Sequence, residues 1–438
     1  MVSAEHASRR VVITGLGIVS PLGLAKDAFW SALVEGRSGV APLEQPLKDL
    51  HISYGGAARE FNEGIDNFGA LPSEKKKQIR KGLKTLCRES IMGLASAQRA
   101  LGDAGYGDGG YDPDRVGVVF GTDYMLMDAA EFAAGIAACT TDKQFDFTQW
   151  TTAGFAKLFP LWLLRYLPNM PSAHLGIYND LRGPSNSITF REAAFNLSLT
   201  EATRIIQRGQ ADIMVAGATG TRLHPMSVIH VVQNETVANG EAPERSARPF
   251  DLNRRGLVMG EGAGSVVVES LESAEARGAT IYGEVVGMGS SAVCDRKLNA
   301  KCDVALANAL RAALRTAQMT PDDLGHIQAH GLGTKRCDID ESHAIQAVCG
   351  ERKSPVPVTA LKSFTGHMGA GSGAVELIAG LLSLANNQLY PTLNYETPDP
   401  ECPVNVVRSK GVSPGDSFAN LCVTPQGQAS CVIVKRWK

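Results

Sequence analysis

The sequence contains no C-x-x-C pair, although it has 9 cysteines among its 438 residues. The cysteines are scattered and odd in number, a pattern that fits neither a disulfide framework nor a zinc site. The first ten residues are polar and lack the apolar stretch of a secretory signal. We therefore predict reduced thiols, no metal site and a cytoplasmic protein.

Long apolar runs and a strong charge of either sign are also missing. The most apolar window, 158–167, contains Pro160 and Arg165 and is too short to span a bilayer. Lys plus Arg number 43 against 45 Asp plus Glu, a net charge of −2. Neither a membrane span nor a nucleic-acid partner is therefore expected.

What is present is typical of a globular α/β protein. Four short apolar runs end at or next to a glycine, and three longer stretches between them have helical periodicity. The predicted strands are 11–15, 116–121, 213–217 and 327–331, and the predicted helices are 90–101, 195–208 and 304–317. In such folds ligands bind where strands give way to loops, so the residues after each run are the first candidates for a site.

Two segments interrupt this alternation. Residues 125–176 carry many aromatic and apolar side chains, which predicts a lid or an interface. Residues 289–303 are polar and have little periodicity, which predicts a loop beside the pocket.

Two glycine-flanked histidines are the strongest candidates for chemistry. His330 follows a predicted strand, and Lys362 and His367 share a glycine-rich stretch at 361–373. Neutral imidazole N–H groups placed around one pocket can stabilise charge that develops on a carbonyl oxygen. The other histidines are interpreted as structural or surface groups: His6, His51, His174, His224, His230, His326 and His343.

Two glycine-containing segments lack a specific ligand signature. Residues 256–264 have neither the lysine of a P-loop nor the order of a dinucleotide fingerprint, so we interpret them as tight backbone packing. Residues 183–194 are typical of a strand-to-helix junction.

Several motifs, in order along the chain, resemble those of the β-ketoacyl-ACP synthases of the thiolase superfamily, especially type II condensing enzymes. The motifs lie at 12–23, 181–185, 209–217, 248–251, 260–264, 329–331 and 362–367. The resemblance implies a thiolase-like α/β fold of two similar halves in five α-β-α-β-α layers. We expect the halves at 1–270, including the 125–176 insertion, and 271–438. It also implies a homodimer or a related heterodimer, no resident cofactor, and acyl chains carried on the phosphopantetheine arm of acyl carrier protein.

The nucleophile of this family is absent. Members carry a cysteine nine residues after the glycine of the Gly-Pro pair, and counting from Gly183 places Glu192 there. No other cysteine lies in a comparable turn. A carboxylate attacking a thioester gives a labile mixed anhydride, so covalent condensation loses its first step.

Two further segments depart from the family. The family's glycine-rich loop near the C-terminus is replaced at 423–428 by a stretch containing Pro425. The turn near the acyl entrance is altered at 292–297.

The residues that support decarboxylation of a malonyl thioester in the family remain, at His330, His367 and Lys362. Glu192 at a helix N-terminus would be stabilised by the helix dipole. It would pair with Lys362 or a protonated histidine as a structural salt bridge, or else act in catalysis.

Three functions follow. The favoured one is a non-condensing partner subunit, similar to a chain-length factor, for a cysteine-bearing ketosynthase. The second is an enzyme without the thiol, either a malonyl-ACP decarboxylase or a catalyst with Glu192 as general base. The third is a 3-oxoacyl-ACP synthase with an unrecognised nucleophile.

Overall fold

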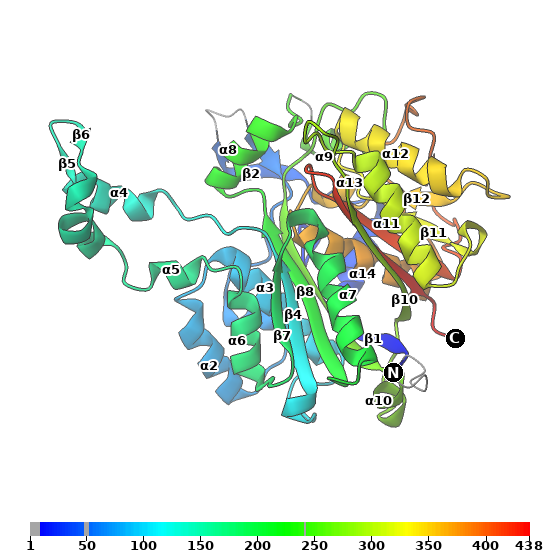
Figure 1. Cartoon of the computed structure of the whole chain (residues 1–438), viewed down its shortest axis with the longest axis horizontal. Coiled ribbons are helices and arrows are strands. Elements are labelled where there is room, and N and C mark those ends of the chain that lie inside the picture. The colour runs from blue at the N-terminus through cyan, green and yellow to red at the C-terminus, as the bar shows by residue number, and fades with distance from the viewer. Residues whose placement is uncertain (1–8, 48–51, 241) are drawn as a thin grey trace.

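Two half-sheets with the same strand order form the centre of the molecule (Figure 1). The computed structural model describes residues 9–47, 52–240 and 242–438. In spatial order, the N-terminal half-sheet consists of β7 (Ser185–Thr189), β4 (Val116–Thr122), β8 (Ile213–Thr221), β9 (Glu261–Ser270) and β1 (Val11–Val19). The C-terminal half-sheet consists of β10 (Gly283–Ala292), β15 (Gln428–Lys435), β14 (Ser417–Val423), β11 (His326–Gln328), β12 (Pro357–Thr359) and β13 (Asn405–Val406).

The two half-sheets repeat one pattern of strand directions. In each, three strands run parallel (β7, β4 and β8, or β12, β11 and β14), and the next two strands pair antiparallel. A short antiparallel contact, Val12 opposite Glu284 and Ile13 opposite Gly283, joins them into one 11-stranded sheet. The prediction of two similar halves is confirmed.

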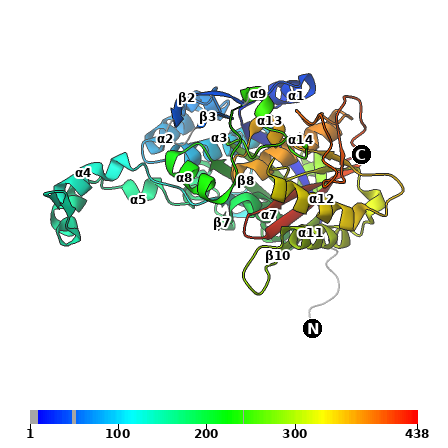
Figure 2. The ribbon, with the colours of Figure 1, turned by 90° about the horizontal axis from the view of Figure 1, so that it is seen from above.

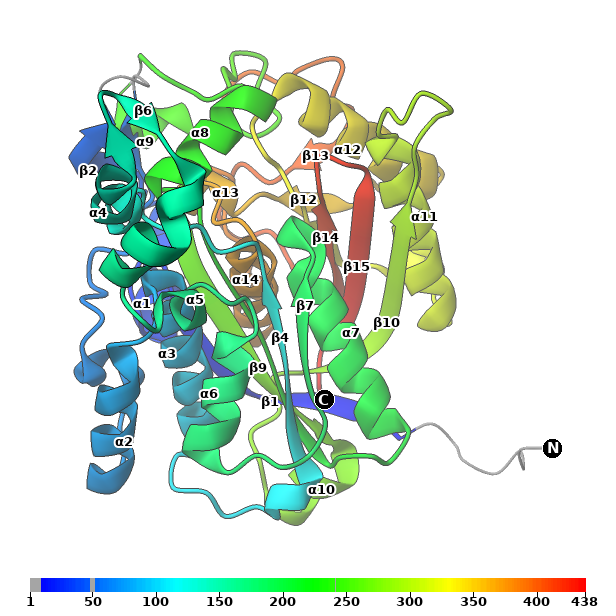
Figure 3. The same ribbon diagram turned by 60° about the vertical axis from the view of Figure 1, so that its left-hand side comes forward.

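Helices form the other layers. The central layer consists of α7 (Ala194–Gln207) and α14 (Gly371–Ala385), which lie between the half-sheets in Figure 3 and contact both. The outer faces are covered by α3 (Arg88–Asp103) and α11 (Cys302–Thr316). Nearly every residue of α14 is buried, as expected of a helix that is apolar on all sides. The predicted five-layer thiolase-like architecture is confirmed.

The remaining elements surround this core. The other helices are α1 (Lys26–Glu35), α2 (Ser73–Leu83), α4 (Ala130–Ala138), α5 (Trp162–Arg165), α6 (Met170–Asn179), α8 (Pro225–Asn234), α9 (Pro243–Ser246), α10 (Leu271–Ala276), α12 (Lys335–Cys349) and α13 (Lys362–Thr365). Two small hairpins are formed by β2 (Ala41–Leu47) with β3 (Ile52–Gly55), and by β5 (Thr140–Thr141) with β6 (Gln144–Phe145). None of the helices in the described ranges could cross a membrane.

All seven predicted strands and helices are present, with shifted ends. The prediction of a loop over 289–303 is partly wrong, because β10 continues to Ala292 and α11 begins at Cys302. The end of β10 alternates between half-buried and exposed residues while pairing with β15. The sequence does not predict this part of the strand, because its small polar side chains give little apolar signal.

Most of the aromatic-rich insertion projects from the body as an arm, which comprises residues 126–168 (Figures 1 and 2). The chain then returns through α6, which packs against α3. Exposed apolar side chains gather on the arm: Ile136, Phe145, Phe147, Phe155, Phe159, Leu161, Leu163 and Leu164. So many exposed apolar groups in one segment are typical of an interaction surface, and the interface prediction stays open.

Candidate active site

Glu192 lies where the N-terminal half-sheet meets the central helices. The edge strand β7 ends at Thr189, and a single 3₁₀ turn, Arg191–Ala193, leads directly into α7. Arg191 has a φ of 52°, a left-handed conformation that costs a side-chain-bearing residue roughly 1–2 kcal/mol. The turn directs Glu192 into the interior, where its side chain is 2% exposed.

The partners of Glu192 are Arg222 and His367. The Arg222 guanidinium lies 2.6 Å from Glu192 Oε1, and His367 Nε2 lies 3.1 Å from the same oxygen. Burial alone would raise the pKa of Glu192, but Arg222, the His367 hydrogen bond and Arg191 lower it well below its usual value. Glu192 is therefore an ionised, internally paired carboxylate at neutral pH.

Arg222 was not predicted from the sequence as a site residue. It is 2% exposed and also contacts Asp123 at 2.7 Å, so that one guanidinium connects two carboxylates. Asp123 follows β4 and Arg222 follows β8, and these two strands are parallel neighbours. The rule that ligand-facing groups follow parallel strands would have found both residues.

Lys362 is not a partner of Glu192, so the predicted Glu192–Lys362 pair is wrong. Its ammonium lies 2.6 Å from Glu376 Oε1 on α14 and donates at 2.5 Å to the carbonyl oxygen of His330. Burial would lower the pKa of Lys362, but Glu376 outweighs burial and raises it. Lys362 thus stays charged and holds the His330 segment from behind.

His330 and His367 face each other, with ring centroids 6.1 Å apart. Burial lowers the pKa of His367 to about 4, although Glu192 opposes the shift. Burial and Lys362 lower the pKa of His330 well below its usual value. Both rings are neutral at pH 7. Because an ionised carboxylate only accepts hydrogen bonds, the N–H on His367 Nε2 is already used by Glu192.

The loop that carries His330 is fixed by a buried carboxylate. The backbone N–H groups of His330 and Gly331 donate to the two oxygens of Glu341, each at 2.7 Å. Burial raises the pKa of Glu341 to about 8, although these bonds oppose the shift.

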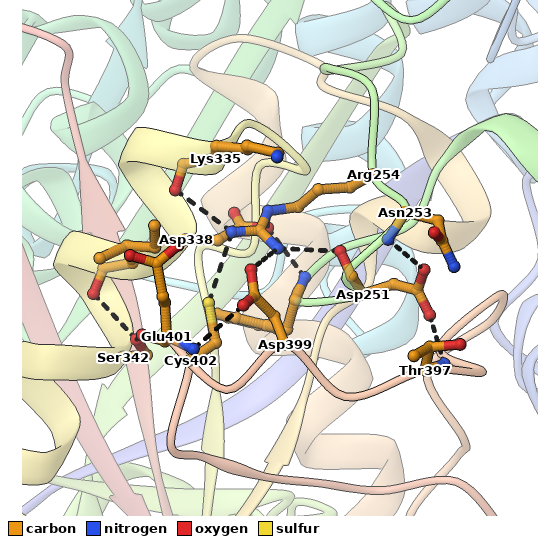
Figure 4. Close-up of polar contacts among 12 residues, drawn as sticks. Asp251, Asn253, Arg254, Lys335, Asp338, Ser342, Thr397, Asp399, Glu401 and Cys402 are labelled. Atoms are coloured by element: carbon orange, nitrogen blue, oxygen red, sulfur yellow. Dashed lines mark hydrogen bonds and ion pairs between the residues drawn. The ribbon is translucent and has the colours of Figure 1, made fainter.

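A second network holds the loop containing the 248–251 motif (Figure 4). Arg254 donates at 2.6 Å to Asp399 and at 2.8 Å to the carbonyl oxygen of Asp251, and it lies 3.3 Å from Asp338. Asp338 in turn accepts from the backbone of Gly333, two residues from the His330–Gly331 pair. This network joins three separate segments and fixes the far side of the His330 loop.

The glycines at 260–264 pack closely, as predicted. A Cβ on Gly264 would lie 2.8 Å from Ala374 on α14, and one on Gly262 would lie 2.8 Å from the carbonyl oxygen of Val19. These glycines let the central helix approach β9.

Glu192, His330 and His367 open onto one cavity of about 280 Å³. Lys362 lies behind it. The wall also contains His230, which was interpreted as a structural or surface group, and its Nδ1 contacts the Tyr124 hydroxyl. Other lining residues are Arg191, Arg222, Val231, Asn234, Glu235, Leu257, Cys302, Leu332, Arg336, Cys337, Asp340 and 423–426.

The other histidines differ in their surroundings. His326 is fully buried and bonded to the carbonyl oxygen of Pro414, His174 contacts Tyr178, and His224 caps α8. His343 is exposed on α12. His6 and His51 lie outside the described residues.

Comparison with known proteins decides the family. The model described as the beta-ketoacyl synthase N-terminal domain matches residues 8–274, and the one for its C-terminal domain matches 282–396. The chain belongs to the beta-ketoacyl synthase family. It is 31% identical to 3-oxoacyl-[acyl-carrier-protein] synthase 2 of Synechocystis sp. over 95% of this chain and 94% of that enzyme. The synthase 2 of Coxiella burnetii is 32% identical, with 91% of each chain covered.

Solved structures of the family superpose over almost the whole chain. A beta-ketoacyl synthase from Burkholderia phymatum has a TM-score of 0.83 at 26% identity, covering 98% of this chain and all of its own. The ishigamide ketosynthase/chain length factor has a TM-score of 0.80 at 27% identity, covering 99% and 100%. The AntDE:AntF complex, a type II ketosynthase with its acyl-carrier protein, has a TM-score of 0.79 at 28% identity, also covering 99% and 100%.

The two segments predicted to depart from the family, 423–428 and 292–297, differ in their relation to the cavity, and only the first of them lines it. The turn between β14 and β15 lines it, and Gln426 accepts a hydrogen bond from Arg191 at 3.1 Å. From the predicted loop at 289–303, only Cys302 lines the cavity.

Two cysteines, Cys302 and Cys337, lie in the cavity wall, and neither is activated. Burial raises the pKa of Cys302 to about 11, and that of Cys337 well above its usual value. All nine cysteines are free thiols. Because the thiolate is the reactive form, the wall offers no ready nucleophile.

Proposed function

We propose that this protein is a non-condensing beta-ketoacyl synthase that serves, like a chain-length factor, as the partner of a cysteine-bearing ketosynthase. It handles acyl chains carried on acyl carrier protein without bonding to them. The observation that carries the proposal is the buried ion pair between Glu192 and Arg222. It supports the proposal because motif spacing predicts the family's nucleophile at position 192.

The state of Glu192 argues against covalent catalysis. Its pKa lies well below the usual value, and its Oε1 atom is bound by both Arg222 and His367. A weakly basic, paired carboxylate is a poor nucleophile towards a thioester. Its acyl product, an anhydride, would be labile.

The oxyanion machinery is also partly occupied. Two imidazole N–H groups would be needed to stabilise a developing enolate, but His367 Nε2 already donates to Glu192. His330 remains, and Lys362 and Glu341 hold its backbone. His330, His367 and Lys362 therefore serve mainly to hold the shape of the pocket, and less to catalyse a reaction in it.

The arm supports a partner role. Its exposed side chains include Phe147, 72% exposed, and Leu163, 54% exposed. The ishigamide structure is named as a ketosynthase with a chain length factor, and AntDE:AntF as a ketosynthase with its acyl-carrier protein. By analogy we propose a dimer, preferably a heterodimer with a ketosynthase, that operates in the cytoplasm. We also propose that the boundary between the two ketosynthase-like halves lies at 270/271.

A second candidate is decarboxylation of malonyl-ACP. An ionised Glu192 by itself would repel the malonyl carboxylate, but Arg222 balances its charge, and Arg191 lies 3.5 Å from its other oxygen. His330 is free to donate to the thioester. A synthase that uses another nucleophile ranks last, because Cys302 and Cys337 both have raised pKa values.

Two measurements separate these functions. The purified protein is incubated with malonyl-ACP, and CO₂ loss is followed by mass spectrometry of the carrier. Co-expression with a ketosynthase from the same gene neighbourhood then tests for a stable complex. The proposal expects no turnover alone and a complex that makes products of defined length. Rapid decarboxylation by the isolated protein would favour the second candidate.

A further inference from the structure

A second cavity, of about 390 Å³, lies where the arm meets the body. It shares no lining residue with the cavity of Glu192. Its wall is formed by Leu86, Cys87, Arg88, Glu89, Met125, Leu126, Asp128, Glu131, Arg165, Tyr166, Thr221, Leu223, His224, Ser227 and Glu261.

Two carboxyl oxygens in this wall are buried and have no donor in hydrogen-bond geometry, although the Tyr166 hydroxyl lies close to the second carboxylate. They are Glu89 Oε1, on α3 of the body, and Glu131 Oε2, on α4 of the arm. Glu89 is 7% exposed. An unpaired buried polar group typically costs about 1–3 kcal/mol, so two such acceptors in one cavity point to a donor supplied by a ligand.

The charges in the wall indicate the sign of that ligand. Its two guanidinium groups each have a carboxylate partner, Arg88 with Glu261 at 2.7 Å and Arg165 with Glu131 at 2.5 Å, although Arg165 Nε is a buried donor without a hydrogen-bond partner. Glu89 has no such partner. Burial and the nearby Asp123 raise the pKa of Glu89 well above its usual value, a shift that a bound cation would reverse.

We propose that this cavity binds a small organic cation with a primary ammonium group and a short aliphatic portion. The ammonium has three N–H donors, enough for both Glu89 Oε1 and Glu131 Oε2. The aliphatic portion packs against Leu86, Met125 and Leu223. A metal ion fits less well, because the described part of the chain contains no cluster of three or more ligating His, Cys, Asp or Glu residues.

Such a ligand connects the arm to the body. Glu89 belongs to the outer helix of the N-terminal half, whereas Glu131 belongs to the first helix of the arm. A cation held by both would reduce the motion of the arm. The proposal does not depend on acyl binding, since the two cavities are separate.

The direct test is isothermal titration of the full-length protein with butylammonium chloride. We expect saturable binding, weakened about tenfold by Glu89→Gln and by Glu131→Gln. Glu74→Gln, whose side chain is 85% exposed on α2, is the matched control and should bind as the wild type does. The neutral analogue 1-butanol should bind at least about tenfold more weakly, because it lacks the charge.

Limited proteolysis provides a second readout. Butylammonium should slow tryptic cleavage at Lys143 and Lys157 in the wild type but not in Glu131→Gln. Glu131 is partly exposed, so this variant is expected to fold even if Glu89→Gln does not. Absence of saturable butylammonium binding, or equal binding by the wild type and Glu131→Gln, would overturn the proposal.

Discussion

The carboxylate of Glu192 and the guanidinium of Arg222 form a 2.6 Å ion pair in which each side chain is 2% exposed. By motif spacing, Glu192 is predicted to stand where the beta-ketoacyl synthase family has its nucleophile. Because Asp123 binds the same guanidinium, the three residues form one buried unit. This unit sets the charge at this part of the cavity wall.

Removal of Arg222 should destabilise the fold strongly. Arg222→Met leaves Asp123 buried without its cation and leaves Glu192 only Arg191, at 3.5 Å. Breaking a buried pair on one side costs about 3–5 kcal/mol. The free energy of unfolding is measured by urea denaturation. Arg182→Met, at an exposed pair with Asp180, is the control and should change it by less than about 1 kcal/mol. Equal stability of Arg222→Met and the wild type would show that the pair is not buried as described.

Stability should fall as the pH is lowered from about 6.5 towards 4. Burial lowers the pKa of His326 and of His367 to about 4. A histidine in the unfolded chain has a pKa near 6.5. Between about pH 6.5 and 4 the unfolded chain therefore binds more protons than the folded protein, and the free energy of unfolding falls by at most roughly 3 kcal/mol per histidine. Urea denaturation at several pH values should show a shallower dependence for His326→Gln and His367→Gln than for His343→Gln, which is exposed. Parallel dependences in all three variants would contradict this.

A thiol at position 192 should restore covalent loading. In Glu192→Cys, Arg222 keeps Asp123 as its partner, and His367 Nε2 is released to face the new side chain. The variant should gain the mass of one acyl group after incubation with acyl-loaded carrier protein. Glu192→Ala is the matched control and should gain nothing. Failure of a folded Glu192→Cys to load would mean that more than the sulfur has been lost.

The arm should be required for association. Phe147→Asp and Leu163→Asp place charge on its exposed apolar surface and should reduce complex formation, measured by sedimentation velocity and co-purification with a ketosynthase. Neither side chain belongs to the buried core, so stability should change by less than about 0.5 kcal/mol. Leu298→Asp, at an 83% exposed leucine outside the arm, is the control. Association that is unchanged in both arm variants would exclude the arm as the interface.

The sequence predicted the fold well because short, mostly apolar runs that reach a glycine mark core strands. The position of Glu192 followed from motif spacing alone. Its partner did not, since Arg222 is 30 residues away and only its place after the parallel strand β8 points to it. The sequence does contain a signal for the partner of Lys362. Glu376 is the single charged residue of the otherwise apolar helix α14, and a buried acid in such a helix requires a cation.

Intact-mass spectrometry of the wild-type protein after exposure to acyl-loaded carrier protein is the most direct test of non-covalent handling. The ion pair between Glu192 and Arg222 predicts an unchanged mass under conditions in which a cysteine-bearing ketosynthase is fully loaded. A stable acyl adduct on any side chain, mapped by peptide fragmentation, would contradict it.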